Sequence, residues 1–366
     1  MSNTKPLNKP DLSALNRLID DRNDKAQAQR ITLFAGLYYD AAPVADFNAR
    51  NPDDLYGATV SCWQFIQENN ITKPKVRVFN PDFEAHGWQS THTVIEVLVK
   101  EMPFLIDSVR LELNRRQMSI HAIHSCVAHI ERDAKQKIKA SSPILKANEK
   151  TQAEAIIYIE VDRHTDSDML EDLSKTLVLI LNEVNHCVED FHALKAKAAL
   201  MSDELNQLPC EKSKKEIKES QDFLAWLGNE HFTFLGCDEF SIEKKGGKTY
   251  LNREESHDLG IFRYHESNVS RSKLEELPAE IQAFVLSPNI VNFFKSGVRS
   301  RVHRPAYPDY VVVKRFNDVG EVIGGVRFIG LYTSTVYIES PNNIPLIRQK
   351  LQQVRKLAGF ERGSHG

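Results

Sequence analysis

Apolar and polar residues alternate over residues 93–99, which is the two-residue period of a strand. One face of this strand would hold Ile95, Val97 and Val99. Glu96 would lie on the opposite, polar face. Apolar residues then recur at four-residue spacing after Pro103, whose missing N–H suits the first turn of a helix. Two more strands and a long helix follow, over residues 118–131, 153–162 and 167–197. The pattern therefore predicts a strand–helix–strand–strand–helix unit.

The long helix carries a regular apolar seam with spacings of three and four residues. Its members are Leu170, Leu173, Leu177, Ile180, Val184, Cys187, Phe191 and Leu194. A heptad seam of this kind predicts lengthwise packing against another helix or a sheet. The partner could belong to the same chain or to another subunit, and the pattern leaves both open.

The second half of the chain changes character to aromatic-rich strands. A Lys-Gly-Gly turn at 245–247 and a turn at 317–320 predict two hairpins. A final helix is expected from near Asn343, with Pro345 in its first turn. Its apolar stripe would be Ile347, Leu351, Val354 and Ala358. These elements predict a second mixed α+β domain, for which a PAS-like sensor fold is one interpretation.

Together these patterns predict an α+β protein with five segments. They are a helical N-terminal segment (1–92), a strand–helix–strand–strand–helix domain with the long helix (93–197), a charged helical connector (198–220), the second α+β domain (221–358) and a truncated linker (359–366). A chain of 366 residues is long enough for two or three such domains.

Composition excludes several classes of protein. A net charge of -3 argues against a dedicated nucleic-acid binder. We find no apolar run of the roughly 18 residues that a membrane span needs, and the polar N-terminus does not resemble a secretory signal. The five cysteines are scattered and form no Cys-x-x-Cys, which favours a reducing cytoplasm over a disulfide framework or a zinc site.

No residue pattern points to catalysis, nucleotide binding or a metal within this chain. We find neither a G-x-S-x-G elbow nor a glycine-rich phosphate loop. His121, His124 and His129 are close in sequence, but on a strand His124 faces away from the other two. His121 and His129 would themselves be about 26 Å apart, at roughly 3.3 Å per residue. We therefore predict no catalytic, cofactor-binding or metal-binding residues here.

A basic cluster in "KSGVRSRVHRPAYPDY" is one candidate binding site. Arg299, Arg301 and His303 would project from one face of an extended segment, with Arg304 beside them. Arginine binds phosphate or carboxylate in a bidentate manner, so the cluster could hold an anion. The alternative is a solvated edge or a charged contact with another domain.

The turn in "EMPFLIDSVRLELNRR" is the other candidate. The order of strand, proline-containing turn, amphipathic helix and second strand resembles an ACT domain. In ACT domains this turn often reads Pro-Gly-Leu-Leu and contacts a bound amino acid. The resemblance implies an effector site at Pro103, Phe104, Leu105 and Asp107. Phe104 stands where the glycine would be, and its side chain could fill the space of a ligand.

Three longer blocks resemble one family. "MPFLIDSVRLELNRR", "FLAWLGNEHFTFLGCDEF" and "FIGLYTSTVYIESPNNIPLIRQKLQQVRKLAGF" are similar to the N-terminal region of the large bacterial NAD-specific glutamate dehydrogenases. Members of that family carry several ACT-like modules ahead of a dehydrogenase core and assemble as homo-oligomers. The resemblance implies a cytoplasmic regulatory and assembly region, whose partners are the rest of the polypeptide, other subunits and an amino-acid effector. NAD would bind only the parent enzyme's core, outside this chain.

The sequence leaves two alternative functions open. The chain could be a free-standing amino-acid sensor that uses the ACT-like turn. It could also be a structural oligomerisation module that packs through the long helix.

Overall fold

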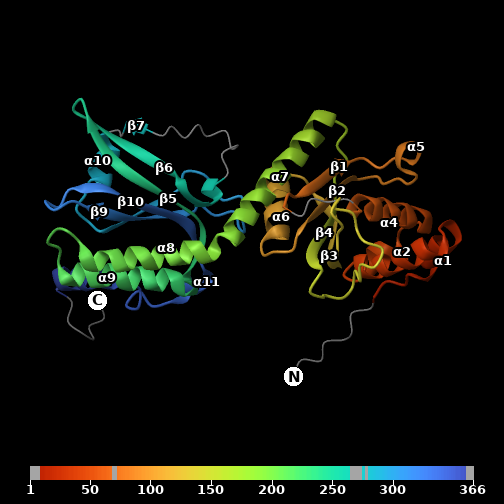
Figure 1. The fold of residues 1–366 in the computed structure, drawn as a ribbon, viewed down its shortest axis with the longest axis horizontal. Coiled ribbons are helices and arrows are strands. Elements are labelled where there is room, and N and C mark those ends of the chain that lie inside the picture. Colours follow the sequence, from red (N-terminus) through yellow and green to blue (C-terminus); the bar gives the residue numbers. More distant parts are fainter. Residues whose placement is uncertain (1–8, 68–71, 264–273, 277–278, 360–366) are drawn as a thin grey trace, which may run out of the picture. The chain divides into compact units, whose positions relative to one another are not determined.

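The computed structural model describes residues 9–67, 72–263, 274–276 and 279–359. The chain divides into two compact units, residues 1–182 and 183–366. The division lies inside a helix, whereas the sequence patterns placed a domain boundary after residue 197. Each unit has its own antiparallel sheet, as Figure 1 shows. The predicted α+β class is therefore confirmed.

Unit 1 begins with a group of helices: α1 (Ser13–Arg22), α2 (Lys25–Tyr38), α3 (Val44–Asn48), α4 (Pro52–Ile66) and the short α5 (Phe83–His86). The Asp24 side chain accepts hydrogen bonds from the first backbone amides of α2, and Asn51 caps α4 with Pro52 following it. Helices α1 to α4 pack on one face of the four-stranded sheet (Figure 1).

The sheet of unit 1 has the order β1-β2-β4-β3, and all neighbouring strands are antiparallel. Its strands are β1 (Lys75–Phe79), β2 (Thr93–Lys100), β3 (Ile120–Ile130) and β4 (Gln152–Val161). Helix α6 (Leu105–Arg115) connects β2 to β3, and α7 (Ser167–Glu189) follows β4. The predicted strand–helix–strand–strand–helix order is confirmed.

The fourth strand of this sheet comes from an unexpected part of the chain. A β-α-β-β-α-β unit would be completed by a strand after its second helix. Here β1, which precedes the whole unit in sequence, occupies the edge beside β2. The first 92 residues, predicted to be helical, therefore also contain a strand of the sheet.

The polar face predicted for β2 is buried. Glu96 is 1% exposed, because the N-terminal helices cover the face on which it lies. Arg77 on the neighbouring strand β1 pairs with its carboxylate, and the N–H of Arg77 Nε donates to Glu96 Oε2 at 2.8 Å. Both faces of β2 are thus buried, although the alternation of apolar and polar residues predicted one buried and one solvated face.

The predicted long helix is two helices. α7 ends at Glu189, and α8 (Phe191–Glu204) begins after Asp190, which has a non-helical backbone (φ -88°, ψ 1°). Most of the predicted seam is buried within the described chain, namely Leu173, Leu177, Ile180, Val184, Cys187 and Leu194. Phe191, at the break, is 38% exposed. The seam therefore already has partners in this chain.

Unit 2 contains a sheet of order β7-β6-β5-β10-β9-β8. Its strands are β5 (Phe232–Lys245), β6 (Lys248–Gly260), β7 (Leu274–Glu276), β8 (Val291–Lys295), β9 (Asp309–Phe316) and β10 (Val322–Tyr332). Both predicted hairpins are confirmed, since β5 pairs with β6 and β9 with β10. Gly246 and Gly247 both have positive φ, as the tight turn between β5 and β6 requires.

The helices of unit 2 are α8, α9 (Lys214–Trp226), α10 (Ala279–Val285), α11 (Ser334–Ile338) and α12 (Ile347–Ala358), with short turns at η1 (Leu205–Gln207), η2 (Leu227–His231) and η3 (Ile261–Arg263). The last helix begins at Ile347, so Pro345 precedes it and does not form its first turn. Its predicted stripe is not buried, since Val354 is 59% exposed. Of the predicted linker 359–366, residues 360–366 lie outside the described part.

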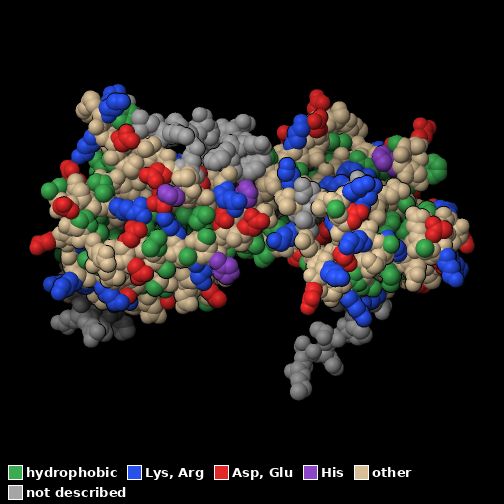
Figure 2. All heavy atoms as spheres, in the orientation of Figure 1, with side chains coloured by type: hydrophobic (Ala, Val, Ile, Leu, Met, Phe, Trp, Pro, Cys, Tyr) green, Lys and Arg blue, Asp and Glu red, His purple; other side chains and the backbone are tan. Residues whose placement is uncertain are grey.

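None of the described helices is both long and apolar enough to cross a bilayer. In the space-filling view, positive and negative side chains are interspersed over the face shown (Figure 2). A mixed surface of this kind agrees with the small net charge of the chain.

Candidate functional site

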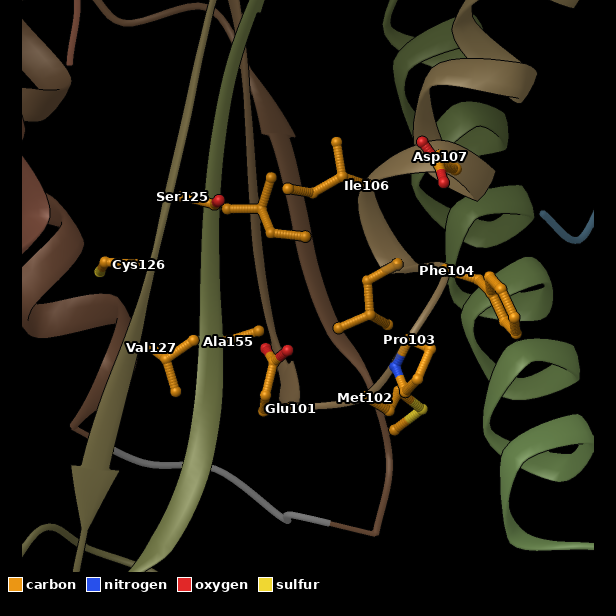
Figure 3. A pocket seen from close by; sticks show the side chains of 12 residues that line it. Glu101, Met102, Pro103, Phe104, Ile106, Asp107, Ser125, Cys126, Val127 and Ala155 are labelled. Atoms are coloured by element: carbon orange, nitrogen blue, oxygen red, sulfur yellow. The ribbon is translucent and has the colours of Figure 1, made fainter. Parts of the chain in front are cut away.

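The turn between β2 and α6 opens onto a pocket of about 430 Å³. The predicted residues Pro103, Phe104, Leu105 and Asp107 all line it. The other wall comes from the central strand β4 and the edge strand β3. Its residues are Ser125, Cys126, Val127, Ala155 and Ile157. Figure 3 shows the turn facing these strands. A volume of this size is within the range of small-molecule sites.

Phe104 adopts the conformation for which glycine is suited. Its φ of 74° and ψ of 2° lie in the left-handed region, and it is the N-cap residue of α6. A non-glycine residue pays about 1–2 kcal/mol for this conformation. Its side chain points away from β3 and β4, as Figure 3 shows, so it leaves the space between the turn and the strands open.

The N-terminus of α6 gives the pocket a partial positive charge. The first backbone amides of a helix have no acceptor within the helix, and the side chain of Phe104 offers none. The helix dipole adds to the attraction of these amides for an anion. Asp107, in the first turn of α6, also lines the pocket and brings a carboxylate to this helix end.

Glu101, together with Asp107, supplies the opposite charge. It ends the strand side of the turn and lines the same pocket, and its carboxylate lies between the turn and the strands in Figure 3. Partial burial raises the pKa of Glu101 above its ordinary value. The sequence patterns did not select this residue, although it directly precedes the predicted turn. The lining residues of β3 and β4 could not have been selected, because only the strand pairing brings them to the turn.

The three histidines of β3 have separate surroundings. His124 is 9% exposed and its ring stacks on Tyr158, and burial lowers its pKa to about 3. His121 lies 2.7 Å from Asp162 and stacks on the ring of His92. Among the described residues there is no group of three or more His, Cys, Asp or Glu side chains that could hold a metal ion.

The basic cluster does not converge on one point. Arg301 pairs with Glu183, and Arg304 donates to the carbonyl of Tyr332. Arg299 lies over the ring of Tyr307 at 5.3 Å, and His303 has a positive φ of 70°. The side chains of Arg301 and Arg304 are thus already engaged within unit 2. Anion binding at Arg299, Arg301, His303 and Arg304 stays a prediction.

Replacing Arg299 and Arg301 by Ala tests that prediction. If the cluster binds an anion, phosphate should raise the melting temperature of the chain, and the double variant should lose this effect. Thermal unfolding across a phosphate titration measures it, with sodium chloride at matched ionic strength as the control. An equal response of both proteins would contradict an anion site.

The comparisons with known proteins agree with this geometry. Residues 34–177 match the model of the glutamate dehydrogenase ACT1 domain, which includes β1 to β4, α6 and the pocket-lining turn. The matched range begins within α2, so it contains α3, α4 and the end of α2, whereas α1 precedes it.

Two relatives match nearly the whole chain. An NAD-specific glutamate dehydrogenase of Halomonas elongata is 42% identical over 97% of the chain, and one of Pseudomonas aeruginosa is 39% identical over 93%. The chain spans only 22% and 21% of their lengths. From the domain match and these two relatives, we conclude that the chain belongs to the NAD-specific glutamate dehydrogenase family and corresponds to an N-terminal region of its members.

Proposed function

We propose that this chain is the N-terminal regulatory and assembly region of an NAD-specific glutamate dehydrogenase. The parent enzyme would convert L-glutamate, NAD and water to 2-oxoglutarate, ammonium and NADH. The observation that carries the proposal is the 42% identity over 97% of the chain to a relative more than four times as long. NAD and the catalytic residues would lie in the remaining part, and the other subunits of a homo-oligomer would be its partners. All five cysteines are free, which supports a role in the cytoplasm.

The pocket at the ACT-like turn is the proposed effector site. The partial positive charge at the end of α6 and the carboxylates of Glu101 and Asp107 suit the zwitterion of an amino acid. The α-carboxylate would accept hydrogen bonds from the first amides of α6, and the ammonium group would pair with Glu101. Apolar groups of Val127, Ala155 and Ile157 would contact the side chain of the ligand. Such a ligand regulates only if it binds two conformations of the parent enzyme with different affinities.

Val127→Trp should strongly weaken amino-acid binding. Val127 is 38% exposed and lines the pocket, so a tryptophan there fills space without disturbing the core. We expect calorimetry with the twenty amino acids at millimolar concentration to detect at least one ligand, and the variant to weaken its binding at least tenfold. Glu101→Gln should weaken the binding of the same ligand, because it removes the charged partner of the ammonium group.

Leu145→Trp is the matched control for this substitution. Leu145 is 45% exposed in the same unit and does not line the pocket, so it should leave binding unchanged. Flat calorimetry with all twenty amino acids would remove the effector site from the proposal and would also rule out the free-standing sensor.

The size of the native polypeptide tests the proposal itself. An antibody raised against this chain should detect a protein several times larger than 41.7 kDa in the source cells. Glutamate-dependent reduction of NAD should accompany that larger protein and be absent from the isolated chain. A native band near 41.7 kDa would favour the free-standing sensor instead.

The buried seam bears on the structural oligomerisation hypothesis. Leu177 and Val184 are both fully buried within the chain, so they have no surface to offer to another subunit. Subunit contacts of the parent enzyme would therefore use other surfaces of this region.

A further inference from the structure

A groove of about 440 Å³ lies in unit 2, along the edge strand β8. Its floor is formed by residues 289–293, and Phe284 at the end of α10 borders it. The other lining side chains come from α9, from α12 and from the residue before α12: Glu216, Ser220, Leu346, Gln349, Lys350 and Gln353. None of these residues takes part in the proposed effector site.

The floor of the groove is an open strand edge. The N–H of Lys314 donates to the carbonyl of Ile290, and the N–H of Ser296 donates to the carbonyl of Pro308. Residues 290 and 296, which flank β8, and every second residue between them therefore direct their main-chain polar groups to β9. In an antiparallel ladder, the positions between them turn their N–H and C=O groups to the other side. The main-chain N–H and C=O groups of Val291, Phe293 and Lys295 therefore lie on the outer edge. Among the described residues, no strand pairs with β8 on this side.

A buried polar group also faces this groove. The Ser220 side chain is 1% exposed, yet its hydroxyl has no hydrogen-bond partner among the described residues. Leaving a buried hydroxyl unsatisfied costs about 1–3 kcal/mol. Glu216, one turn earlier on α9, accepts a hydrogen bond from the N–H of Ile290 and so holds α9 beside the start of β8. Ser220 is thus placed to donate to a carbonyl that lies along the edge.

The walls combine apolar and amide groups with one positive side chain, Lys350, and one negative side chain, Glu216. Phe284 and Phe293 are 39% and 37% exposed, and Gln349 and Gln353 present carboxamides, which pair well with peptide groups. Lys350 makes no ion pair with any described residue. The groove therefore suits an extended segment with an apolar side chain and a carboxylate opposite Lys350.

We propose that this groove binds an extended segment of the longer parent polypeptide, which adds to β8 as a further strand of the sheet. Main-chain hydrogen bonds to the open edge supply affinity in this mode of recognition, and side-chain pockets supply specificity. The inference rests on the proposed function, because it takes the segment from outside residues 1–366. The relatives supply such segments, since residues 1–366 correspond to about a fifth of their length.

The test uses the purified 366-residue chain. Fluorescently labelled twelve-residue peptides would tile the part of the Halomonas elongata relative that lies outside the matched region. We expect anisotropy to detect at least one binding peptide that exceeds its own scrambled sequence. Hydrogen exchange should then slow at residues 291–295 and stay unchanged at residues 103–107.

Phe293→Pro and Phe293→Ala form a matched pair. Proline removes the outward N–H of this edge position and leaves the hydrogen bonds to β9 intact, as edge strands tolerate. Both variants lose the aromatic ring, but only alanine keeps the N–H, so proline should weaken peptide binding at least tenfold more than alanine does. Ser220→Ala should reduce affinity several-fold without loss of folding, because Ser220 has no partner to lose within the described chain.

Three results would overturn the inference: no peptide binding above the scrambled controls, equal binding by the proline and alanine variants, or binding without protection of residues 291–295. A native polypeptide near 41.7 kDa would instead overturn the proposed function. A large native polypeptide without any binding peptide would overturn this inference alone.

Discussion

Arg77→Met should lower the free energy of unfolding of unit 1 by about 3–5 kcal/mol at pH 8, because it leaves a buried carboxylate without its counter-ion. Glu96 is 1% exposed, and two nitrogens of Arg77 donate to its Oε2. Arg77 also donates to Ser61 on α4, so the pair lies between the sheet and the N-terminal helices. A large loss is expected because the charge cannot reach water without opening that interface.

The loss should shrink as the pH falls. Burial raises the pKa of Glu96, and Arg77 partly opposes this. Removing Arg77 raises the folded-state pKa further, whereas the unfolded value stays near 4.5. Between those two values the folded form binds more protons than the unfolded form, so stability falls as pH rises through the window. The deficit should therefore be smaller at pH 5 than at pH 8.

Glu96→Gln provides the control for the charge effect. Combining it with Arg77→Met removes the buried charge that has lost its counter-ion. The double variant should therefore regain most of the lost free energy of unfolding, and the pH dependence of the deficit should disappear. Urea unfolding in a Trp226→Phe background measures this, since Trp63 and Trp88 then report on unit 1 alone. If the free energy of unfolding of Arg77→Met lay within about 1 kcal/mol of the unsubstituted chain, Glu96 would have found another partner or water.

Leu177→Glu should unfold unit 1 rather than separate subunits. Leu177 is fully buried on the seam of α7, where truncation to alanine alone would cost about 2–5 kcal/mol. A carboxylate at this position adds the penalty of burying a charge without a partner. We expect loss of the cooperative unfolding transition of unit 1, measured by circular dichroism and tryptophan fluorescence.

Lys175→Glu is the matched control on the same helix. The Lys175 side chain is 70% exposed and pairs with Glu171, one turn away, so its replacement should cost less than about 1 kcal/mol. Light scattering separates the two interpretations of the seam. A Leu177→Glu protein that stays folded and only changes its mass in solution would place the seam between chains.

The local patterns determined most of the elements of this protein. Alternation identified β2, four-residue spacing identified α6, and Lys-Gly-Gly identified the turn between β5 and β6, because each depends on the residues of a single element. The break at Asp190 was missed since the apolar seam continues across it in register, and periodicity cannot distinguish one helix from two.

Only part of the candidate site could be predicted from these local patterns. Pro103 and Leu105 belong to one short turn, whose order resembles a known module, so they could be selected. By sequence alone Phe104 could fill the space of a ligand, because the sequence specifies which side chain is present but not where it points. Its left-handed backbone directs the ring away from β3 and β4, and only the structure shows that the space is open.

The sequence by itself thus determined the α+β class, the order of elements around the turn and the family to which the chain is similar. The tertiary structure alone decided that β1 closes the sheet from the N-terminal side, that Glu96 is buried and paired with Arg77, and that β8 is an open edge. The physical reason is that these features depend on contacts between residues far apart in sequence. Periodicity records which face of an element is apolar, whereas strand pairing and helix packing decide what covers that face.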